Sequence, residues 1–319
     1  MAETTGGQGR SEQRPGLLAR EALILLLTLA IGVVLLTLLV LAPRMLYDRN
    51  GRPMPPSVPV YLGNVREYLV DLAGGSLGRT NRGRSVNSEL LEAARRSLEL
   101  LAISFAVALS VGLGWGALLA GVRRRWLAAL LFGLSTLLLS LPSFLVMLLA
   151  TEGVATLTFR TGIQLTYVQG YGLDRHLILP TLVLGLRGAA FVARSTQVAH
   201  EEIMRQDWLR AARARGLGGF TLWRRHVLPA LRLPLLGISL GMLRTLVGGL
   251  VIIDYVYGWG GLGRKMLQVN FGIVSAANDE MILGAAVLLL CFFVLIDALG
   301  RLLLRGADPR LSEQGIARE

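Results

Sequence analysis

The sequence has few cysteines and few charged residues for its length. Its one cysteine, Cys291, lies inside an apolar run, so the chain can form neither an internal disulfide nor a cluster of thiolate metal ligands. Charged residues make up only 17% of the 319 positions, whereas 53% are hydrophobic. Soluble domains carry about a quarter charged residues. This balance excludes an ordinary soluble domain and indicates an integral membrane protein.

Sequence motifs for catalysis and for nucleotide binding are missing as well. No G-x-x-x-x-G-K-[ST] phosphate loop occurs, and the glycine-rich "GWGGLGRK" at 258–265 follows an apolar segment rather than a β-strand. The stretch "HEEIM" that begins at His200 lacks the second histidine of the H-E-x-x-H zinc motif. No pairing of a nucleophile with a base is evident. We therefore expect neither enzymatic activity nor a metal or cofactor bound by this chain.

Lysine is almost absent, because Lys265 is the only one among 33 basic residues, yet the formal net charge is +12. Such a basic chain could bind nucleic acid. In a membrane protein, however, arginine accumulates in the cytoplasmic loops, which accounts for the same charge. We expect the lipid bilayer to be a partner and nucleic acid not to be one.

Six segments are long and apolar enough to cross roughly 30 Å of hydrocarbon as helices. The first is longer than the apolar core of a signal peptide and is followed by no small-residue cleavage site, so we expect a retained anchor. The predicted fold is all-α and integral to the membrane, with a larger external loop between the first two of six transmembrane helices. The spans are approximately 22–42, 98–121, 126–150, 177–199, 233–256 and 281–304.

Arginine placement predicts the orientation of these spans. The loops after the second and fourth spans carry three and seven arginines, whereas the loops after the third and fifth carry two basic residues each. By the positive-inside rule, the two arginine-rich loops and both termini are cytoplasmic. The loop at 43–96 is placed outside despite nine arginines, because charge stops deciding orientation in loops of about 60 residues. The predicted parts are a polar cytoplasmic tail (1–20), the first transmembrane helix (21–42), an external loop with short helices (43–96), a five-helix core (97–305) that includes a cytoplasmic loop (200–232), and a cytoplasmic C-terminal tail (306–319).

Both ends of the external loop have helical patterns. In "VYLGNVREYLVDLAGG" the apolar residues recur at helical spacing. "SELLEAARRSLEL" predicts a second helix that leads into the membrane, with Asn87 or Ser88 as its N-cap. The N-terminal tail is polar and rich in glycine, so we expect it to lack regular structure. The apolar positions of the helix predicted at the start of the external loop are Tyr61, Val65, Tyr68, Leu69 and Leu72.

The cytoplasmic loop at 200–232 combines good helix formers with helix breakers. Residues 201–215 contain no Gly or Pro and are rich in Ala, Arg and Glu, so they predict a helix that ends at Gly216. Gly218 and Gly219 permit a sharp reversal, and residues 220–227 can form a second helix that ends before Pro229. The pattern predicts a helix–turn–helix elbow under the membrane. It could rest on anionic headgroups, or it could dock on a soluble partner and transmit its motion.

Part of this loop resembles the EAA loop of ABC importer permeases. It has the spacing Ala211-Ala212-x3-Gly216, then nine residues, then His226-x-Leu228-Pro229, and "DWLRAARARGL" is most similar to the form in the peptide and nickel subfamily. Arg210 stands where the general motif has Glu, and Arg215 replaces the usual Lys of the subfamily. Further stretches resemble family motifs in the same order: "GSLGRT" at 75–80, "LPSF" at 141–144, "HLILPTLVLGL" at 176–186, "DYVYGWGGLGR" at 254–264 and "DPRL" at 308–311.

The resemblance implies a permease subunit that forms half of the translocation pathway of an ATP-driven importer for di- or oligopeptides in a bacterial-type cytoplasmic (inner) membrane. It also implies the partners: a second homologous permease, two ABC ATPase subunits that bind ATP and Mg, and an extracytoplasmic substrate-binding protein. In this family the elbow is held by the ATPases, which favours the docking role. Import of nickel or another small solute on the same scaffold, and a secondary transporter, remain alternatives. The residues expected to couple the elbow to the ATPases, called the coupling residues below, are Asp207, Arg210, Ala211, Ala212, Arg213, Arg215, Gly216 and Leu217.

Two arginines, Arg187 and Arg244, fall deep inside spans. An arginine at the centre of the bilayer costs roughly 2.5–3.5 kcal/mol, so each should face a wet cavity or a counter-charge. They could line the passage and meet carboxylate groups or carbonyls of cargo, or form ion pairs, for instance with Asp297. Asp254 and Tyr257 could form an external gate or dock, or could cap and pack a turn. Pro142 should kink the third span. The candidate path or gate residues are Pro142, Phe144, Arg187, Arg244, Asp254 and Tyr257.

Overall fold

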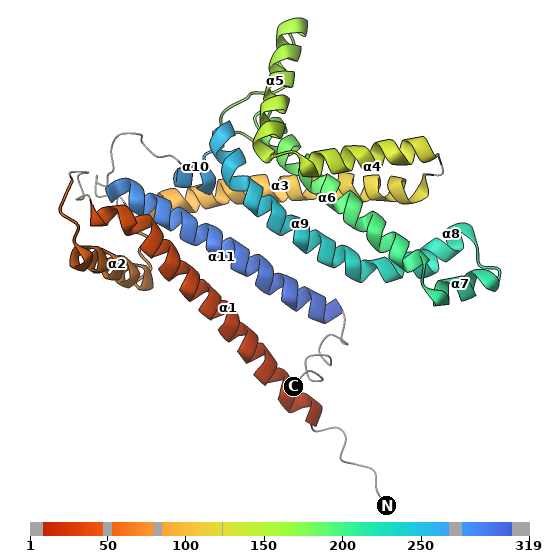
Figure 1. Ribbon diagram of the computed structural model, residues 1–319, viewed down its shortest axis with the longest axis horizontal. Coiled ribbons are helices and arrows are strands. Elements are labelled where there is room, and N and C mark those ends of the chain that lie inside the picture. Colours follow the sequence, from red (N-terminus) through yellow and green to blue (C-terminus); the bar gives the residue numbers. More distant parts are fainter. Residues whose placement is uncertain (1–8, 47–52, 79–84, 123, 268–275, 308–319) are drawn as a thin grey trace, which may run out of the picture. The chain divides into compact units, whose positions relative to one another are not determined.

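A computed structural model of the chain describes residues 9–46, 53–78, 85–122, 124–267 and 276–307. All its regular elements in these residues are helical, which confirms the predicted all-α class (Figure 1). The motif at 308–311 lies outside the described residues. The α-helices are α1 (Gly9–Leu41), α2 (Val58–Ala73), α3 (Val86–Gly121), α4 (Arg125–Ser140), α5 (Ser143–Thr161), α6 (Ile178–Met204), α7 (Asp207–Ala214), α8 (Gly219–Leu222), α9 (Leu228–Tyr257), α10 (Leu262–Leu267) and α11 (Ala276–Ala307).

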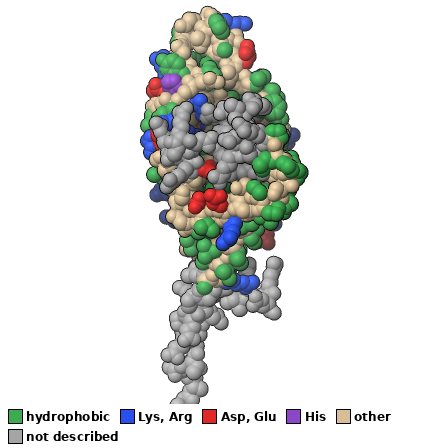
Figure 2. All heavy atoms as spheres, turned by 90° about the vertical axis from the view of Figure 1, so that its left-hand side faces the viewer, with side chains coloured by type: hydrophobic (Ala, Val, Ile, Leu, Met, Phe, Trp, Pro, Cys, Tyr) green, Lys and Arg blue, Asp and Glu red, His purple; other side chains and the backbone are tan. Residues whose placement is uncertain are grey.

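Six helical segments within the described residues are long and apolar enough to cross a membrane, as predicted. Large apolar side chains remain exposed on them, including Leu26 and Leu39 of α1, and Figure 2 shows hydrophobic side chains at the surface around the edges of the face that it draws. Such exposure on long apolar helices suits a lipid environment. The segments are Ala19–Leu41, Val86–Gly121, Ser143–Thr161, Ile178–Met204, Gly219–Tyr257 and Asp279–Ala307.

The third predicted span, at 126–150, is wrong in its bounds. The chain there forms two helices, α4 and α5, and only α5 is long enough to count as a span. The break falls at Leu141, whose backbone is extended (φ −69°, ψ 135°). Because Leu141 precedes Pro142, the proline ring disfavours the helical conformation there, and Pro142 itself has no N–H to continue the helix. Pro142 therefore ends one helix and starts another instead of kinking a single one.

Two predicted helix starts also need correction. The sequence predicts no regular structure at 1–16, but α1 begins at Gly9 because Arg, Glu and Gln let the helix extend outward from the apolar span. In α3 the N-cap is Ser85, whose hydroxyl accepts a hydrogen bond from the Asn87 N–H at 3.3 Å. The Asn87 side chain instead accepts from the Leu77 N–H and donates to the Gly75 carbonyl, both at 2.8 Å.

The helices pack into two compact units. The first comprises residues 1–87 and 270–298, and the second comprises 88–269 and 299–319. In the first unit, apolar side chains of α1, α2 and α11 share a core, and the Tyr61 hydroxyl donates to the Leu38 carbonyl at 2.7 Å. The helical pattern predicted from Tyr61 to Leu72 is thereby confirmed as α2. The buried core residues are Leu41, Val65, Tyr68, Leu283 and Val287.

In the second unit, α6 packs against α9, α4 and α3. Small residues allow the α3 contact to be close. A Cβ atom on Gly112 would lie 2.6 Å from Val192 Cβ and 2.8 Å from the Ala189 carbonyl oxygen, so a larger residue would force the two helices apart. This kind of small-residue contact is typical of helices that pack inside membranes. All the functional features described below belong to the second unit.

Candidate functional site

The elbow, defined here as residues 205–227, joins α6 to α9 and is more broken than predicted. The helix expected at 201–215 is two helices, because α6 runs to Met204 and α7 starts afresh at Asp207. Between them Gln206 has an extended backbone (φ −65°, ψ 140°). An acidic residue in the first turn favours a helix start, which is consistent with a new helix at Asp207. Figure 1 shows α7 and α8 where α6 ends and α9 begins.

Gly216 ends α7 as predicted. Its φ of +83° is left-handed, and the Leu217 N–H reaches back to the Ala212 carbonyl at 3.3 Å, the bond typical of a glycine-terminated helix. Beyond the reversal, α8 leads into a π-helical turn over Trp223–Val227 that runs directly into α9. The expected helix end before Pro229 is therefore wrong. Pro229 lies inside this continuous helix, directly after the π-helical turn, so the helix passes through the proline instead of ending before it.

An apolar cluster fixes the elbow to the membrane helices. Leu209 and Ala212 of α7 are 0% and 1% exposed. Full burial of a leucine side chain contributes about 1.5–3 kcal/mol, so several such contacts hold α7 firmly. Ala212, one of the expected coupling residues, belongs to this buried underside and presents almost no surface to a partner. The buried cluster consists of Ile203, Leu209, Ala212, Leu222, Val227 and Leu231.

The other side of the elbow is exposed and carries cations and aromatic rings. Trp208 is 44% exposed and Phe220 71% exposed, and Phe220 stacks on Trp223 with ring centroids 6.3 Å apart. Arg210 pairs with Asp207 at 3.3 Å, with both side chains largely in solvent. Arginine and aromatic residues are enriched in protein interfaces. The expected coupling residues at this surface are Asp207, Arg210, Ala211, Arg213, Arg215 and Gly216, whereas Leu217 is half-buried.

The three aromatic residues of the elbow were not among the expected coupling residues. Their signal in the sequence is the occurrence of Trp208, Phe220 and Trp223 in a segment otherwise rich in arginine and glycine. Aromatic rings in such a segment have few neighbours to bury them unless a partner does so.

At the opposite end of α9, Asp254 holds a turn. Its carboxylate is fully buried and accepts the N–H groups of Gly261 at 2.8 Å and Arg264 at 3.1 Å. Gly258 (φ +63°) and Gly260 (φ +83°) supply the left-handed backbone that the turn needs. Of the two roles considered from the sequence, this geometry gives Asp254 the capping role.

Buried polar contacts join this turn to neighbouring helices. The Trp259 indole N–H donates to the Arg96 carbonyl of α3 at 2.8 Å, and the Leu262 N–H donates to the Ser97 hydroxyl at 2.8 Å. Tyr257 is only 1% exposed, and its hydroxyl lies 3.4 Å from the Met147 carbonyl of α5. Tyr257 therefore packs the turn rather than presenting itself at the surface.

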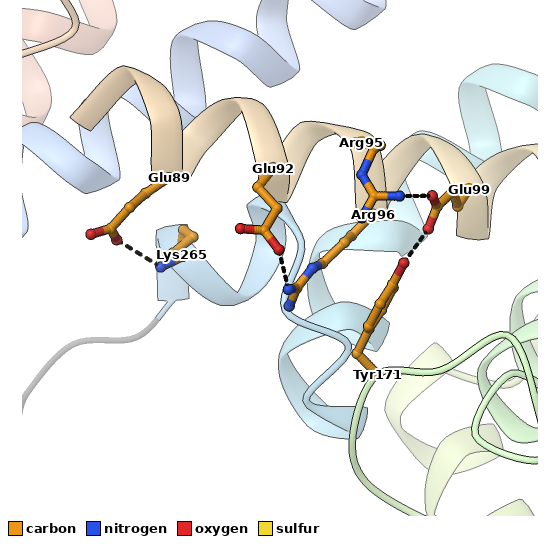
Figure 3. Close-up of polar contacts among 7 residues, drawn as sticks. All are labelled: Glu89, Glu92, Arg95, Arg96, Glu99, Tyr171 and Lys265. Atoms are coloured by element: carbon orange, nitrogen blue, oxygen red, sulfur yellow. Dashed lines mark hydrogen bonds and ion pairs between the residues drawn. The ribbon is translucent and has the colours of Figure 1, made fainter. Parts of the chain in front are cut away.

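Around the turn lies a set of charged contacts, here called the ion-pair cluster (Figure 3). Lys265 of α10 pairs with Glu89 at 3.1 Å, and the Tyr171 hydroxyl donates to Glu99 at 2.7 Å. That hydrogen bond to a carboxylate raises the pKa of Tyr171. The cluster ties the start of α3 to α10 and to the loop before α6. Its members are Glu89, Glu92, Arg95, Arg96, Glu99, Tyr171 and Lys265.

Sequence reasoning missed the ion-pair cluster, although part of it has a sequence signal. Arg95 pairs with Glu99 at 2.6 Å, and Arg96 pairs with Glu92, each across one helical turn. Opposite charges four residues apart on a predicted helix indicate such pairs. The links to Tyr171 and Lys265 cross 72 and 176 residues, so local spacing could not reveal them.

A cavity of about 240 Å³ opens between α5, α6 and α9. Arg187 lines it together with Ser143 and Thr245, and apolar side chains make up most of the remaining wall. The Arg187 guanidinium donates to the Leu141 carbonyl at 2.9 Å, at the break between α4 and α5. Arg244 is not part of this wall and is exposed, although it does make a polar interaction.

The remaining candidates occupy different places. Phe144 is 64% exposed on α5, and Pro142 is the exposed residue just before that helix. The structure therefore does not bring the six candidate path residues together. Within the described residues, no group of three or more His, Cys, Asp or Glu side chains could hold a metal ion.

Comparisons with known proteins give a consistent result. Residues 112–311 match the family described as "Binding-protein-dependent transport system inner membrane component". The chain is 31% identical over 290 residues to the Escherichia coli protein named "Probable D,D-dipeptide transport system permease protein DdpB", covering 81% of this chain and 82% of the relative. It is 29% identical over 287 residues to the oligopeptide transport system permease protein OppB of Mycobacterium bovis, covering 84% and 86%.

Among solved structures, the fold is similar to a chain of the MetNI methionine ABC transporter in an inward-facing conformation. The TM-score is 0.55 at 23% identity, over 69% of this chain and 96% of that one. At this identity the likeness concerns the fold alone.

Proposed function

Since this chain belongs to the family of binding-protein-dependent transport system inner membrane components, we propose that it is the permease subunit of an ATP-driven importer of di- or oligopeptides. Peptide cargo is supported by the names of relatives that align with more than four-fifths of the chain. The structure of the elbow carries the proposed coupling to the ATPases. Apolar packing anchors its buried side to the membrane helices, and its exposed side carries arginines and aromatic rings.

The proposed partners follow from the two ends of α9. This helix has 30 residues, so it is about 45 Å long and its ends reach opposite faces of a bilayer. The arginine-rich elbow takes the cytoplasmic face by the positive-inside rule, with both termini on the same side. There it meets two ABC ATPase subunits, which bind ATP and Mg and perform the hydrolysis. The opposite face receives cargo from an extracytoplasmic binding protein, and a second permease completes the pathway.

The geometry suggests how motion passes from the ATPases to the membrane. A partner that grips the exposed residues of α7 also moves Leu209 and Ala212 on the same helix. Their buried contacts include Ile203 of α6 and Leu231 of α9, so these two membrane helices move with the elbow. Transport requires the permease to change between two conformations. A partner can drive this change only if it contacts the two conformations differently. ATP-driven closure of the ATPases supplies that difference.

Co-purification and uptake test the proposal together. The tagged chain is expressed with the ATPase, permease and binding-protein genes of its own transport system. We expect the tag to recover the second permease and the ATPases, and the reconstituted complex to take up a labelled dipeptide only with ATP inside the cytoplasmic compartment. Recovery of this chain alone, or uptake driven by an ion gradient without ATP, would contradict the proposal and favour a secondary transporter. Uptake of nickel but not peptides would instead select the metal alternative.

A further inference from the structure

We propose that the cavity at Arg187 is a cargo subsite that binds the free carboxylate of a peptide as it passes through the membrane. This inference rests on the proposed function and deepens it. It concerns the space between α5, α6 and α9, where Arg187 is the only charged residue of the cavity wall that the structure describes.

The charge of Arg187 has no acidic partner among the described residues. Its guanidinium carries five N–H donors, and its one polar contact among the described residues is with the neutral Leu141 carbonyl. Arg194, seven residues further along α6, differs because its guanidinium lies 3.8 Å over the Phe132 ring and bonds the Thr136 hydroxyl at 3.0 Å. An arginine at membrane depth is costly unless it meets water or an opposite charge. Arg187 therefore keeps N–H donors available for an anion in the cavity, whereas Arg194 is not part of the cavity wall.

The break at Pro142 fixes the position of this arginine. In an unbroken helix the Leu141 carbonyl would accept from the Leu145 N–H, but that N–H bonds the Pro142 carbonyl at 3.0 Å instead. The freed Leu141 carbonyl accepts from Arg187. One hydrogen bond of the guanidinium thus positions it at the cavity wall and leaves its other donors for a ligand. A positioned guanidinium matches a carboxylate well, since the two can form paired hydrogen bonds.

The size and lining of the cavity define the ligand. A volume of about 240 Å³ corresponds to several water molecules at roughly 30 Å³ each, enough for a terminal carboxylate and a small side chain but not for a whole oligopeptide. The Ser143 hydroxyl adds a polar group to the wall, whereas the Thr245 hydroxyl donates to the Gly241 carbonyl at 3.0 Å. The rest is apolar and suits an aliphatic C-terminal residue. The apolar lining residues are Val146, Val183, Leu184, Leu246 and Ile253.

The test compares two cargoes in the whole reconstituted transporter: labelled Ala-Ala-Leu with a free C-terminus, and the same peptide as its C-terminal amide. Each variant is scored as its uptake divided by wild-type uptake for the same cargo, per assembled complex, so that the preference of the binding protein cancels. Arg187→Gln can still donate to the Leu141 carbonyl but has no charge. Since a charged hydrogen bond contributes more than a neutral one, we expect about tenfold less uptake of the acid and about twofold or less change for the amide.

Three further variants sharpen the result. Arg187→Lys keeps the charge and should retain most of the uptake of the acid. Ser143→Ala removes one hydroxyl and should reduce uptake of the acid by about twofold, which keeps a readout if Arg187→Gln fails to assemble. Arg194→Gln removes a different arginine of α6 and should leave the ratio of acid to amide uptake at the wild-type value.

The outcomes separate this inference from the proposed function. Equal loss of both cargoes in Arg187→Gln would show that Arg187 only holds the α4–α5 break, and would overturn the subsite. An unchanged ratio of acid to amide uptake in Arg187→Gln and Ser143→Ala would overturn it too. If the wild-type complex took up neither peptide, the proposed function would fail and the subsite with it.

Discussion

The two ends of α9 are built by different physical means. The elbow end is fixed by apolar packing of Leu209, Ala212 and their neighbours, so the polar side of α7 remains available. The turn end is fixed by buried backbone N–H groups that donate to Asp254 and Ser97, and by ion pairs at its rim. Apolar contacts are non-directional and leave the hydrogen-bonding groups free, whereas a satisfied polar network uses those groups up.

This difference matches the two tasks that the proposed function assigns. A segment gripped by a partner needs firm attachment to the membrane helices and unused polar and aromatic groups on its outer side. A turn that holds α9 to α3 and α5 needs one defined geometry, which a buried carboxylate between two backbone N–H groups provides. The predictions below run from the largest expected effect to the smallest.

Replacing Asp254 should give the largest loss of stability. Asp254→Ala removes two hydrogen bonds to a carboxylate, each worth about 1.5–3 kcal/mol, and leaves the Gly261 N–H buried without an acceptor. Asp254→Asn keeps one acceptor oxygen and should lose about half as much. Thermal unfolding of the detergent-purified chain measures both. Equal melting temperatures for Asp254→Ala and the wild type would show that the turn does not depend on this carboxylate.

At the other end of α9, Leu209→Ala should destabilise the elbow by about 2–5 kcal/mol, since it opens a cavity in a fully buried site. The effect should be local. Protease cleavage within residues 205–219 should become faster while the membrane helices stay intact. The exposed neighbour Arg210→Ala serves as the matched control and should cleave at the wild-type rate. Equal cleavage of the two variants would mean that α7 is not held by its apolar side.

Trp208→Ala separates anchoring from docking. Because Trp208 is 44% exposed, its loss should change the stability of the isolated chain by less than about 1 kcal/mol. If the ATPase covers this ring, the affinity for the ATPase should fall by about 2 kcal/mol, or roughly thirtyfold. Titration of ATPase onto the permease pair in nanodiscs gives the affinity, and melting curves give the stability. A drop in stability without a change in affinity would assign Trp208 to the fold.

The ion-pair cluster should contribute little on its own. Lys265→Gln removes a half-exposed pair with Glu89 and should cost below about 1 kcal/mol at low salt. The difference from the wild type should shrink at about 1 M salt, where charges are screened within roughly 3 Å. Melting temperatures at both salt concentrations test this. A large loss that salt does not reduce would indicate a buried role for Lys265.

Alkaline pH should weaken one contact of the cluster. The pKa of Tyr171 is raised in the folded chain by its hydrogen bond to Glu99, so this bond stabilises the fold below the ordinary tyrosine pKa of about 10 and is lost as the pH rises through the higher folded pKa. Absorbance titration of tyrosinate in the wild type and in Tyr171→Phe should reveal one tyrosine that titrates late. The effect on stability should be small, because Arg96 still covers the half-buried ring when this one hydrogen bond is lost. If the tyrosine that is absent from Tyr171→Phe titrated at the ordinary tyrosine pKa, the hydrogen bond to Glu99 would be contradicted.

Patterns confined to one stretch of sequence predicted the fold well. Apolar length gave six spans, and Gly216 marked the end of α7, because each depends on residues close together in the chain. Errors arose where two local tendencies competed. The apolar run around Pro142 predicts one kinked span, whereas the proline breaks it into two helices, and the sequence at Gln206 contains no obvious breaker.

The sites were predictable only in part. The repeated arginines and glycines identify the elbow, but which of its residues face inward depends on packing against α6 and α9, so the sequence predicts a coupling role for Ala212 although it is buried. Likewise the N–H groups that donate to Asp254 lie in the turn after its helix. No periodic pattern in the sequence predicts the path of that turn. The contact of Arg187 with Leu141 spans 46 residues and depends on the helix break.

The central claim, that a separate ATPase grips the elbow, has one direct test. In a Cys291→Ala background, Arg213→Cys places a photoactivatable crosslinker on the exposed side of α7, and Arg175→Cys places it on the exposed loop before the other end of α6. In the assembled transporter, the account predicts that the ATPase is captured from position 213 and not from position 175. Capture of lipid alone from position 213, or of the ATPase equally from both positions, would contradict it.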